Sequence, residues 1–302
     1  MLIHAYKFEG AGNDFVIIDN REEKYNLTNL QIKQLCDRRF GIGADGLMLL
    51  GGHNQYDFSM KYYNADGNIG TMCGNGGRCL VAFAAKMGIT SFEFSASDGY
   101  HIGEIIEQRE NTYTVKLKMN DLSEIIEFQH CGKIVDYTPN GEYRDISNTD
   151  IAGRESNEKA YFLNTGSPHY IEFIRNIKQF PVERVGKFWR WHPSYKDGTN
   201  VNFVEINKSN GNLDGSLFVR TYERGVEAET FACGTGVTAS AIAAFKYQMK
   251  DKTDSIKSGR YEIETLGGSL RVEFIYNPEK RKYTDIYLTG PAKFVFETTI
   301  EI

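Results

Sequence analysis

The feature that constrains this fold most is a pattern that occurs twice along the chain. In each copy a strand is followed by a polar segment, a glycine-rich turn that contains a cysteine, and a run of small and apolar residues; the copies span residues 62–85 and 219–244. The runs at 77–87 and 237–248 are apolar around most of the helical circumference, which is typical of a helix enclosed by protein. The repeat predicts two similar halves, each built around a buried helix.

Other segments alternate apolar and polar residues with a period of two, which predicts half-buried antiparallel strands. Clear examples are residues 56–63, 113–119 and 270–276. One amphipathic helix is expected over residues 28–38, where Thr28 is a candidate N-cap.

A chain of 302 residues is long enough for two domains. We expect an α+β protein with two pseudo-symmetric domains, each a mostly antiparallel sheet wrapped around a central helix. The expected domains are residues 1–135 and 136–289. With the repeat, this arrangement predicts that the two equivalent loops face one another across the domain interface.

Composition excludes several classes of protein. The chain has 35 basic and 40 acidic side chains, a net charge of −5, and no local basic patch, so we expect no nucleic-acid partner. No apolar run approaches the ~20 residues of a spanning helix, and the N-terminal residues do not resemble a secretory signal, so we expect no membrane partner and a cytoplasmic location. The five cysteines are odd in number and irregularly spaced, which favours free thiols.

Cys73 and Cys233 each lie where a glycine-rich turn is expected to become a helix. Unpaired backbone N–H groups and the positive end of the helix dipole surround such a sulfur and favour its thiolate form. The N–H groups that follow, from Gly74 and Asn75 and from Gly234 and Thr235, are suited to hold an anion; a carboxylate is the natural candidate.

This arrangement predicts a reaction at the carbon next to a carboxylate. If the halves face one another, the carboxylate accepts hydrogen bonds from both helix starts and a sulfur stands on each side. One thiolate would remove a proton and the opposite thiol would return one to the other face, which inverts the stereocentre without a metal or an organic cofactor. The histidines show no spacing typical of a zinc site.

Alternative interpretations exist for each residue. A single cysteine in a glycine-rich turn is more often structural, so the repeat is what favours catalysis. We assign no role to Cys36, Cys79 or Cys131; the first two lie in predicted helices and are expected to pack as small hydrophobic side chains.

The chain resembles the diaminopimelate epimerase family of cofactor-independent amino-acid racemases and epimerases. The resemblance covers nearly the whole chain and rests on an ordered set of motifs. In chain order these are GAGNDF at 10–15, RRFGIGADG at 38–46, NADG at 64–67, MCGNGGRC at 72–79, GSPH at 166–169, TNVNFV at 199–204, YERG at 222–225, ACGTG at 232–236 and LTGPA at 288–292.

The resemblance implies interconversion of LL- and meso-2,6-diaminopimelate, for lysine and peptidoglycan synthesis. It implies that Cys73 and Cys233 are the acid/base thiols and that a C-terminal strand, 290–302, returns to the first domain. The substrate-binding residues that it implies, besides the two turns after the cysteines, are Asn13, Asn64, Asn200, Glu223 and Arg224. An arginine suits a distal carboxylate and a glutamate suits an ammonium group. His169 and Ser167 are expected to have secondary roles.

Two departures from the family pattern concern recognition of the distal end of the substrate. Ser167 stands where the family's GNPH segment has an asparagine, and a shorter side chain loses a contact or needs a water. The loop at 226–230 is one residue longer than the common form. Both departures leave the two cysteines and both helix starts unchanged.

Other interpretations of the site stay open. Asn64 and Asn13 suit turns, and Glu223 with Arg224 would ordinarily be a solvated pair. A related racemase that acts on proline or hydroxyproline is one alternative function; such enzymes commonly have a histidine where this chain has Asn75. A thiol redox protein is a more distant one. The expected partner is a small amino acid, and a homodimer is left open.

Overall fold

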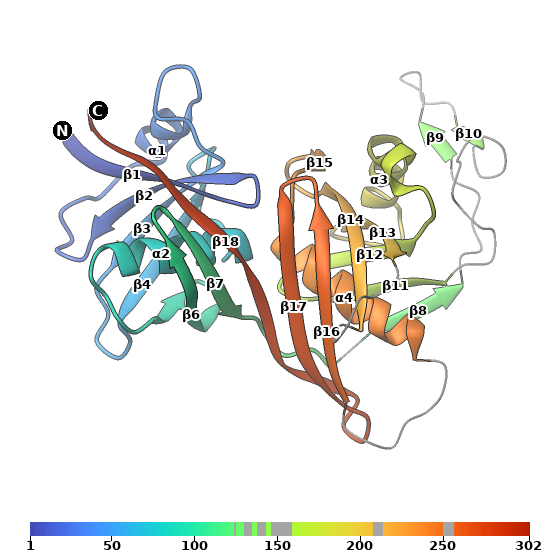
Figure 1. The fold of residues 1–302 in the computed structure, drawn as a ribbon. Coiled ribbons are helices and arrows are strands. Elements are labelled where there is room, and N and C mark those ends of the chain that lie inside the picture. Colours follow the sequence, from blue (N-terminus) through green and yellow to red (C-terminus); the bar gives the residue numbers. More distant parts are fainter. Residues whose placement is uncertain (124, 130–134, 138–142, 146–158, 208–213, 250–256) are drawn as a thin grey trace. The chain divides into compact units, whose positions relative to one another are not determined.

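The computed structural model describes residues 1–123, 125–129, 135–137, 143–145, 159–207, 214–249 and 257–302. The chain divides into two compact units (Figure 1). The first unit contains Met1–Met119 and Leu288–Ile302, and the second contains Asn120–Tyr287.

The boundaries differ from the expected 135/136 and 289/290. Strand β8 (Ile126–Gln129) pairs with β11 (Lys159–Asn164), and Leu122 forms a bridge with Tyr283. These pairings place Leu122 and β8 in the second unit, because a strand is stabilised by the neighbour with which it shares hydrogen bonds.

The first unit has two helices among its strands. They are β1 (Leu2–Gly10), β2 (Asn13–Asn20), α1 (Asn29–Cys36), β3 (Gly46–Gly51), β4 (Phe58–Asn64), α2 (Gly74–Lys86), β5 (Glu93–Ala96), β6 (Gly99–Arg109), β7 (Thr112–Lys118) and the later part of β18 (Lys282–Glu301).

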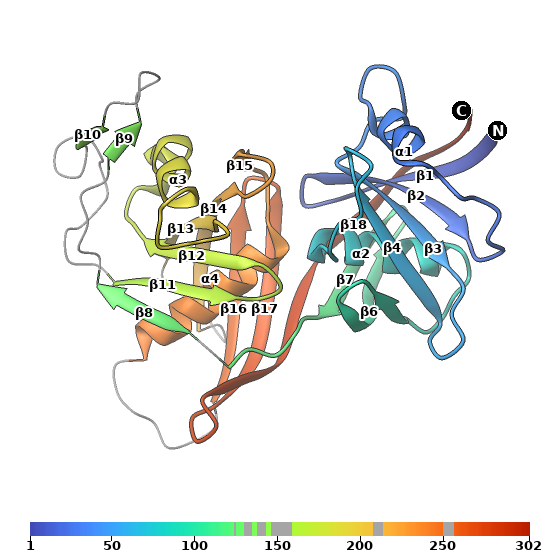
Figure 2. The ribbon, with the colours of Figure 1, turned by 180° about the vertical axis from the view of Figure 1, so that it is seen from behind.

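These strands pair in the order β1-β2-β3-β4-β5-β6-β7-β18, and β18 also pairs with β1, so the pairing closes on itself. All direct neighbours whose register is given run antiparallel except β2 with β3 and β4 with β5. Both views place the chain ends side by side (Figures 1 and 2), and the Ile302 N–H donates to the Met1 carbonyl at 3.0 Å.

Helix α2 is buried among these strands. Every residue from Gly74 to Ala84 is buried, and the helix contacts β1, β2, β3, β6 and β7. Its small residues permit this: a Cβ at Gly77 would lie 2.8 Å from Leu117 Cδ2. Helix α1 begins as expected, because Thr28 and Gln31 form a capping box.

The second unit has a longer set of elements. They are β8, β9 (Val135–Tyr137), β10 (Tyr143–Asp145), β11, β12 (Pro168–Phe173), the 3₁₀ helix η1 (Ile177–Gln179), α3 (Val182–Arg190), β13 (Asn200–Asn207), β14 (Gly215–Glu223), β15 (Ala228–Thr230), α4 (Gly234–Gln248), β16 (Lys257–Thr265), β17 (Gly268–Asn277) and the first part of β18.

The sheet of the second unit has the order β18-β17-β16-β14-β13-β12-β11-β8, with β15 beside β14, while β9 and β10 pair separately. Helix α4 is buried at almost every residue from Gly234 to Phe245 and contacts strands β11 to β14, β16 and β17. None of the helices in the described ranges is long and apolar enough to cross a membrane.

Both units use the same succession of pairings. In the first, β1/β2 and β3/β4 are antiparallel, while β2/β3 and β4/β5 are parallel and enclose α1 and α2 in sequence. In the second, β11/β12 and β13/β14 are antiparallel, while β12/β13 and β14/β16 are parallel and enclose α3 and α4. The sheets therefore contain both parallel and antiparallel pairs. Each of these parallel pairs is connected through a helix, because parallel strands need a crossover connection.

The expected strands are present with shifted ends. Residues 113–119 and 270–276 have buried alternate side chains in β7 and β17 and beside them. The pattern at 56–63 begins too early, because β4 starts at Phe58 and Tyr56 precedes it.

Candidate active site

Each of the two cysteines of the repeat is the residue directly before a buried helix. Cys73 precedes α2 with φ −106° and ψ 131°, and Cys233 precedes α4 with φ −114° and ψ 113°. The first intrahelical bonds run from Gly77 N to Cys73 O and from Val237 N to Cys233 O, at 2.7 and 2.9 Å. The N–H groups between lie ahead of the intrahelical ladder, so each sulfur stands beside a helix start that favours an anion.

A polar chain leads to the sulfur of Cys233. The Thr235 hydroxyl lies 3.4 Å from Cys233 Sγ, 2.9 Å from His169 Nε2 and 3.1 Å from Ser167 Oγ. His169 Nε2 is also 3.0 Å from Ser167 Oγ. Thr235 therefore connects the histidine to the cysteine.

Asn202 determines which groups donate and which accept in this series of hydrogen bonds. Its Nδ2 donates to the Tyr170 carbonyl at 3.1 Å, and its Oδ1 accepts from Thr221 Oγ1 at 3.0 Å, which fixes the amide. The same Nδ2 lies 3.0 Å from His169 Nδ1, so Nδ1 is the acceptor and Nε2 carries the proton.

His169 is fully buried, and burial, assisted by the charge of Arg224, lowers its pKa to about 3. The ring is neutral near pH 7, and its Nε2–H donates to the hydroxyls of Thr235 and Ser167. The Thr235 hydroxyl, with its lone pair so occupied, can donate its own proton to the sulfur of Cys233, and such a bond stabilises a thiolate.

The other expected residues of the second unit surround this chain. Asn200 Oδ1 accepts from Arg224 N at 2.8 Å, while its Nδ2 donates to the Pro168 carbonyl at 3.0 Å and to Ser167 Oγ at 3.3 Å. Arg224 Nη1 donates to Asp197 O at 3.1 Å. Glu223 is the last residue of β14 and is half-buried. Ser167 thus joins the thiol side of the site to the Asn200 side.

In the first unit, two expected site residues are joined by their amides. Asn75 Nδ2 donates to Asn13 Oδ1 at 2.5 Å, and Asn13 Nδ2 donates to Asp45 Oδ2 at 3.0 Å. Asn75 Oδ1 accepts from Arg78 Nη2 at 2.9 Å. An arginine only donates and an aspartate only accepts, so the two ends set the direction of both amides.

Arg78 is fully buried, and among the described residues it forms no ion pair with a carboxylate. Its guanidinium instead donates to carbonyl oxygens of Asn75, Gly74 and Pro291, at 2.9, 3.3 and 3.4 Å. Burial lowers the pKa of the Arg78 guanidinium, whereas a thiolate at Cys73 raises it. This places a cation within the electrostatic range of the Cys73 sulfur.

Asn64 lies at the end of β4 in a turn. Its N–H donates to Asn68 O and its carbonyl accepts from Gly67 N, both at 2.9 Å. Its carboxamide is exposed and forms no hydrogen bond within the described ranges. The turn interpretation is thus correct for the backbone, and the side chain is left accessible to a ligand.

Cys36 and Cys79 pack as expected. They are 4% and 0% exposed, and burial raises the pKa of the Cys36 thiol to about 12 and that of Cys79 further. Cys131 lies outside the described residues.

Sequence reasoning missed the residues that orient the site. Asn202, Arg78 and Asp45 contact site residues but do not belong to the expected set. Arg78 had one sequence signal, since it is a charged residue in an otherwise small and apolar helix.

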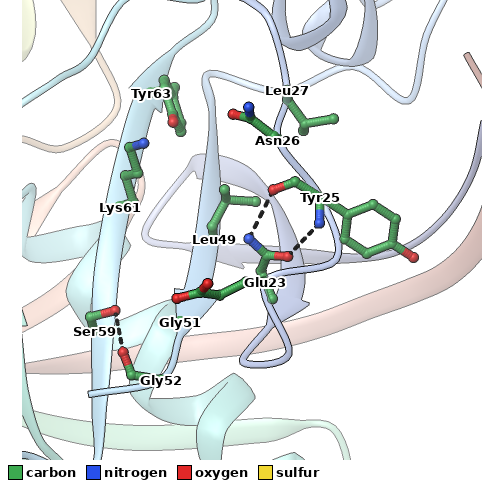
Figure 3. A pocket seen from close by; sticks show the side chains of 11 residues that line it. Glu23, Tyr25, Asn26, Leu27, Leu49, Gly51, Gly52, Ser59, Lys61 and Tyr63 are labelled. Atoms are coloured by element: carbon green, nitrogen blue, oxygen red, sulfur yellow. Dashed lines mark hydrogen bonds between the residues drawn. The ribbon is translucent and has the colours of Figure 1, made fainter. Parts of the chain in front are cut away.

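A separate cavity of about 170 Å³ lies in the first unit (Figure 3). Lys61 and Tyr63 of β4, Leu49 of β3 and Tyr25 line it, and it includes none of the expected site residues. Ligand pockets usually measure at least ~300 Å³, so we assign it no role. Within the described residues, no group of three or more potential metal ligands comes together.

Comparison with solved structures shows a fold similar to those of a PhzF-family protein and a probable proline racemase. A phenazine biosynthesis protein of the PhzF family from Bacillus anthracis matches with a TM-score of 0.68 at 14% identity, covering 100% of both chains. A probable proline racemase from Agrobacterium radiobacter matches with a TM-score of 0.59 at 13% identity, covering 99% of this chain and 93% of that one.

Sequence comparison gives the family. The family model of diaminopimelate epimerase matches residues 5–123 and 161–295. Diaminopimelate epimerases from Flavobacterium psychrophilum and Chlorobaculum tepidum are 42% and 38% identical, covering 98% and 97% of this chain and 99% of each relative. The chain belongs to the diaminopimelate epimerase family.

The cluster that supports Asn13 yields a prediction about pH. Asp14 accepts from Arg38 at 2.8 and 2.7 Å and lies 2.7 Å from Lys7 Nζ. Burial raises the pKa of Asp14, but the two cations outweigh it and hold the pKa well below its ordinary value. The charged carboxylate therefore stabilises the fold above its unfolded pKa of ~3.9, and this stability is lost as the pH falls below that value.

We expect Asp14→Asn to reduce the free energy of unfolding by about 1–2 kcal/mol at pH 7, after allowance for solvent screening, and by progressively less below pH ~4. Urea unfolding at pH 7, 4 and 3 measures this, with the exposed Glu104→Gln as control. Parallel pH curves for wild type and Asp14→Asn would contradict it.

Proposed function

We propose that this protein is an epimerase that interconverts LL- and meso-2,6-diaminopimelate, for lysine and peptidoglycan synthesis. Membership of the family supports the substrate. The observation that carries the mechanism is that Cys73 and Cys233 each precede a buried helix within the same succession of strand pairings. One thiol at a helix start would account only for an anion site. Two thiols in equivalent positions account for two bases.

In this proposal the two units are equivalent halves of a pseudo-symmetric enzyme, each wrapped around a central helix. Their helix starts bind the carboxylate next to the reacting carbon, and the two sulfurs flank that carbon. The boundaries of the two units are taken as the boundaries of the halves.

The chemistry follows from where charge develops. Removing the α-proton moves negative charge onto the carboxylate oxygens, and the N–H groups of Gly74, Asn75, Gly234 and Thr235 are preorganised donors for that charge. One thiolate accepts the proton, the opposite thiol donates one to the other face, and the configuration inverts. Each turnover leaves a proton on one sulfur and removes a proton from the other. The enzyme is then in the protonation state that catalyses the reverse reaction, and no co-reactant is needed.

The environment of Cys233 supports its role as one of the bases. In the proposal the neutral His169 donates to the Thr235 hydroxyl, and this hydroxyl donates in turn to the sulfur, which lies 3.4 Å away. This hydrogen bond stabilises the thiolate, yet the histidine itself stays uncharged. In the proposal it tunes Cys233 and leaves the proton transfer to the thiol.

The remaining expected residues bind the amino-acid groups. Arg224 is assigned to the distal carboxylate and Glu223 to an ammonium group, with Asn13, Asn64 and Asn200 as amide partners. Ser167 is already hydrogen-bonded to His169, Thr235 and Asn200. We therefore propose that Ser167 supports these side chains, and that a water replaces the contact of the family's asparagine. Because the mechanism requires reduced thiols, a reducing compartment such as the cytoplasm suits it.

The direct test is solvent isotope incorporation. With purified protein in deuterated water, free of added pyridoxal phosphate and metal, diaminopimelate is expected to gain deuterium at one α-carbon while LL and meso forms interconvert. Mass spectrometry and chiral chromatography follow the two processes. Incorporation into proline or hydroxyproline instead, or dependence on an added cofactor, would overturn the proposal.

The two-base assignment is tested by Cys73→Ser and Cys233→Ser. A serine hydroxyl is a far weaker acid than a thiol, so each variant is expected to lose at least ~100-fold in epimerisation rate with its circular dichroism spectrum unchanged. Near-normal turnover in either variant would eliminate that residue as a base.

The tuning of Cys233 is tested by Thr235→Val, with Thr235→Ser as the matched control. Valine keeps the shape and the backbone N–H but removes the hydroxyl, so we expect about a tenfold loss in kcat, whereas serine keeps most activity. Equal kcat values for the two variants would show that the hydroxyl does not act on the sulfur.

A further inference from the structure

An ion pair between a buried arginine and an exposed glutamate lies beside the turn that carries Glu223 and Arg224. Arg190, the last residue of α3, is 7% exposed, and its Nε and Nη2 lie 2.9 and 2.8 Å from Glu227 Oε1. The same oxygen accepts from Gly225 N at 3.0 Å. Charge-assisted bonds from two directions therefore fix this carboxylate.

Glu227 also closes the turn through its backbone. Its N–H donates to Glu223 O at 2.8 Å, and its carbonyl accepts from Tyr222 Oη at 2.8 Å. Its φ is +59°, a left-handed conformation that a residue with a Cβ keeps only where surrounding contacts hold it. The ion pair with Arg190 supplies such a contact.

The other side of Arg190 faces the segment that binds Arg224. A Cβ at Gly198 would collide with Arg190 Nη1, so the glycine makes room for the guanidinium. Beside Gly198, Asp197 O accepts from Arg224 Nη1 at 3.1 Å, and Asn200 Oδ1 accepts from Arg224 N at 2.8 Å. Arg190 therefore lies between the two segments that hold Arg224.

The guanidinium of Arg224 is only partly used by the protein. Its Nη1 donates to Asp197 O, whereas its Nε and Nη2 donate to none of the described residues. Nε and Nη2 are the edge with which an arginine binds a carboxylate through two parallel hydrogen bonds. The contact to Asp197 sets the orientation of this edge.

We propose that Arg190 and Glu227 are positioning residues for Arg224: their ion pair holds the 223–227 turn against the 197–200 segment, so that Arg224 presents its Nε and Nη2 edge to the distal carboxylate of the substrate. This rests on the proposed function. The turn overlaps residues 226–230, the loop that is expected from the sequence to be longer than in the family, and the ion pair holds Glu227 within it.

The chain offers a matched control for the test. Glu229 forms a shorter ion pair with Arg220, at 2.6 Å, in the same hairpin, and within the described residues its carboxylate accepts no hydrogen bond from residues 223–227. We expect Glu227→Gln to raise KM for diaminopimelate about tenfold with kcat changed less than about threefold, because ground-state and transition-state binding of the distal end weaken together. Glu229→Gln is expected to leave KM within about twofold of wild type.

A double-mutant cycle separates positioning from general damage. If Glu227 acts through Arg224, then Glu227→Gln adds little to the KM of Arg224→Lys, whereas independent effects would multiply. Multiplying effects, or a wild-type KM in Glu227→Gln, would overturn the positioning role. Arg190→Lys, which keeps the charge but loses the fork, is expected to shift KM in the same direction and serves if Glu227→Gln unfolds, as judged by circular dichroism. Absence of epimerisation in wild type would instead refute the proposed function.

Discussion

Burying the start of a helix inside a sheet is the constraint on which the rest of this protein depends. The first turn of any helix has N–H groups that the helix cannot satisfy, and in α2 and α4 those groups lie in the protein interior beside a cysteine. Burial demands small residues there. Gly236, for example, cannot be replaced by a residue with a Cβ without a collision with Asn202 Oδ1. Close packing and the unpaired N–H groups that suit an anion therefore have the same structural cause.

The two cysteines have chemically different surroundings, although the chain path around them is repeated. Cys233 is 7% exposed, and the Thr235 hydroxyl lies between its sulfur and the buried ring of His169. Near Cys73 the polar elements are a line of amides whose direction is set by Arg78 and Asp45. An enzyme that distinguishes an LL substrate from a meso substrate presents different groups to the two faces of one carbon, and this asymmetry is compatible with that task.

Sequence alone predicted the local elements that a short periodic pattern determines. The helix after Thr28, the alternating strands β7 and β17 and the two buried helices all follow from spacing and residue size. The two compact units divide after Met119 and not at the expected 135/136, because β8 pairs with β11, and nothing in the sequence signals that pairing. The start of β4 was misplaced because alternation continues into the preceding turn.

The residues of the candidate site likewise fall into those that local sequence motifs predict and those that depend on tertiary contacts. Motifs gave the residues that the proposal assigns to the substrate, while the residues that orient them were missed. Asn202 fixes the tautomer of His169, and Arg190 reaches from helix α3 to Glu227 in the turn between β14 and β15. Such contacts depend on tertiary structure, because a polar side chain in a strand looks the same in sequence whether it faces solvent or another side chain.

The long strand β18 has a consequence for how the chain is made. Its residues up to Tyr287 belong to the second unit and those from Leu288 to the first, where they pair with both β1 and β7. During synthesis the strands β1 to β7 leave the ribosome long before this partner exists, so the first unit keeps two open edges until β18 has been made. The half whose synthesis begins first is thus completed after the second, and a chain that lacks β18 would expose strand edges that favour aggregation.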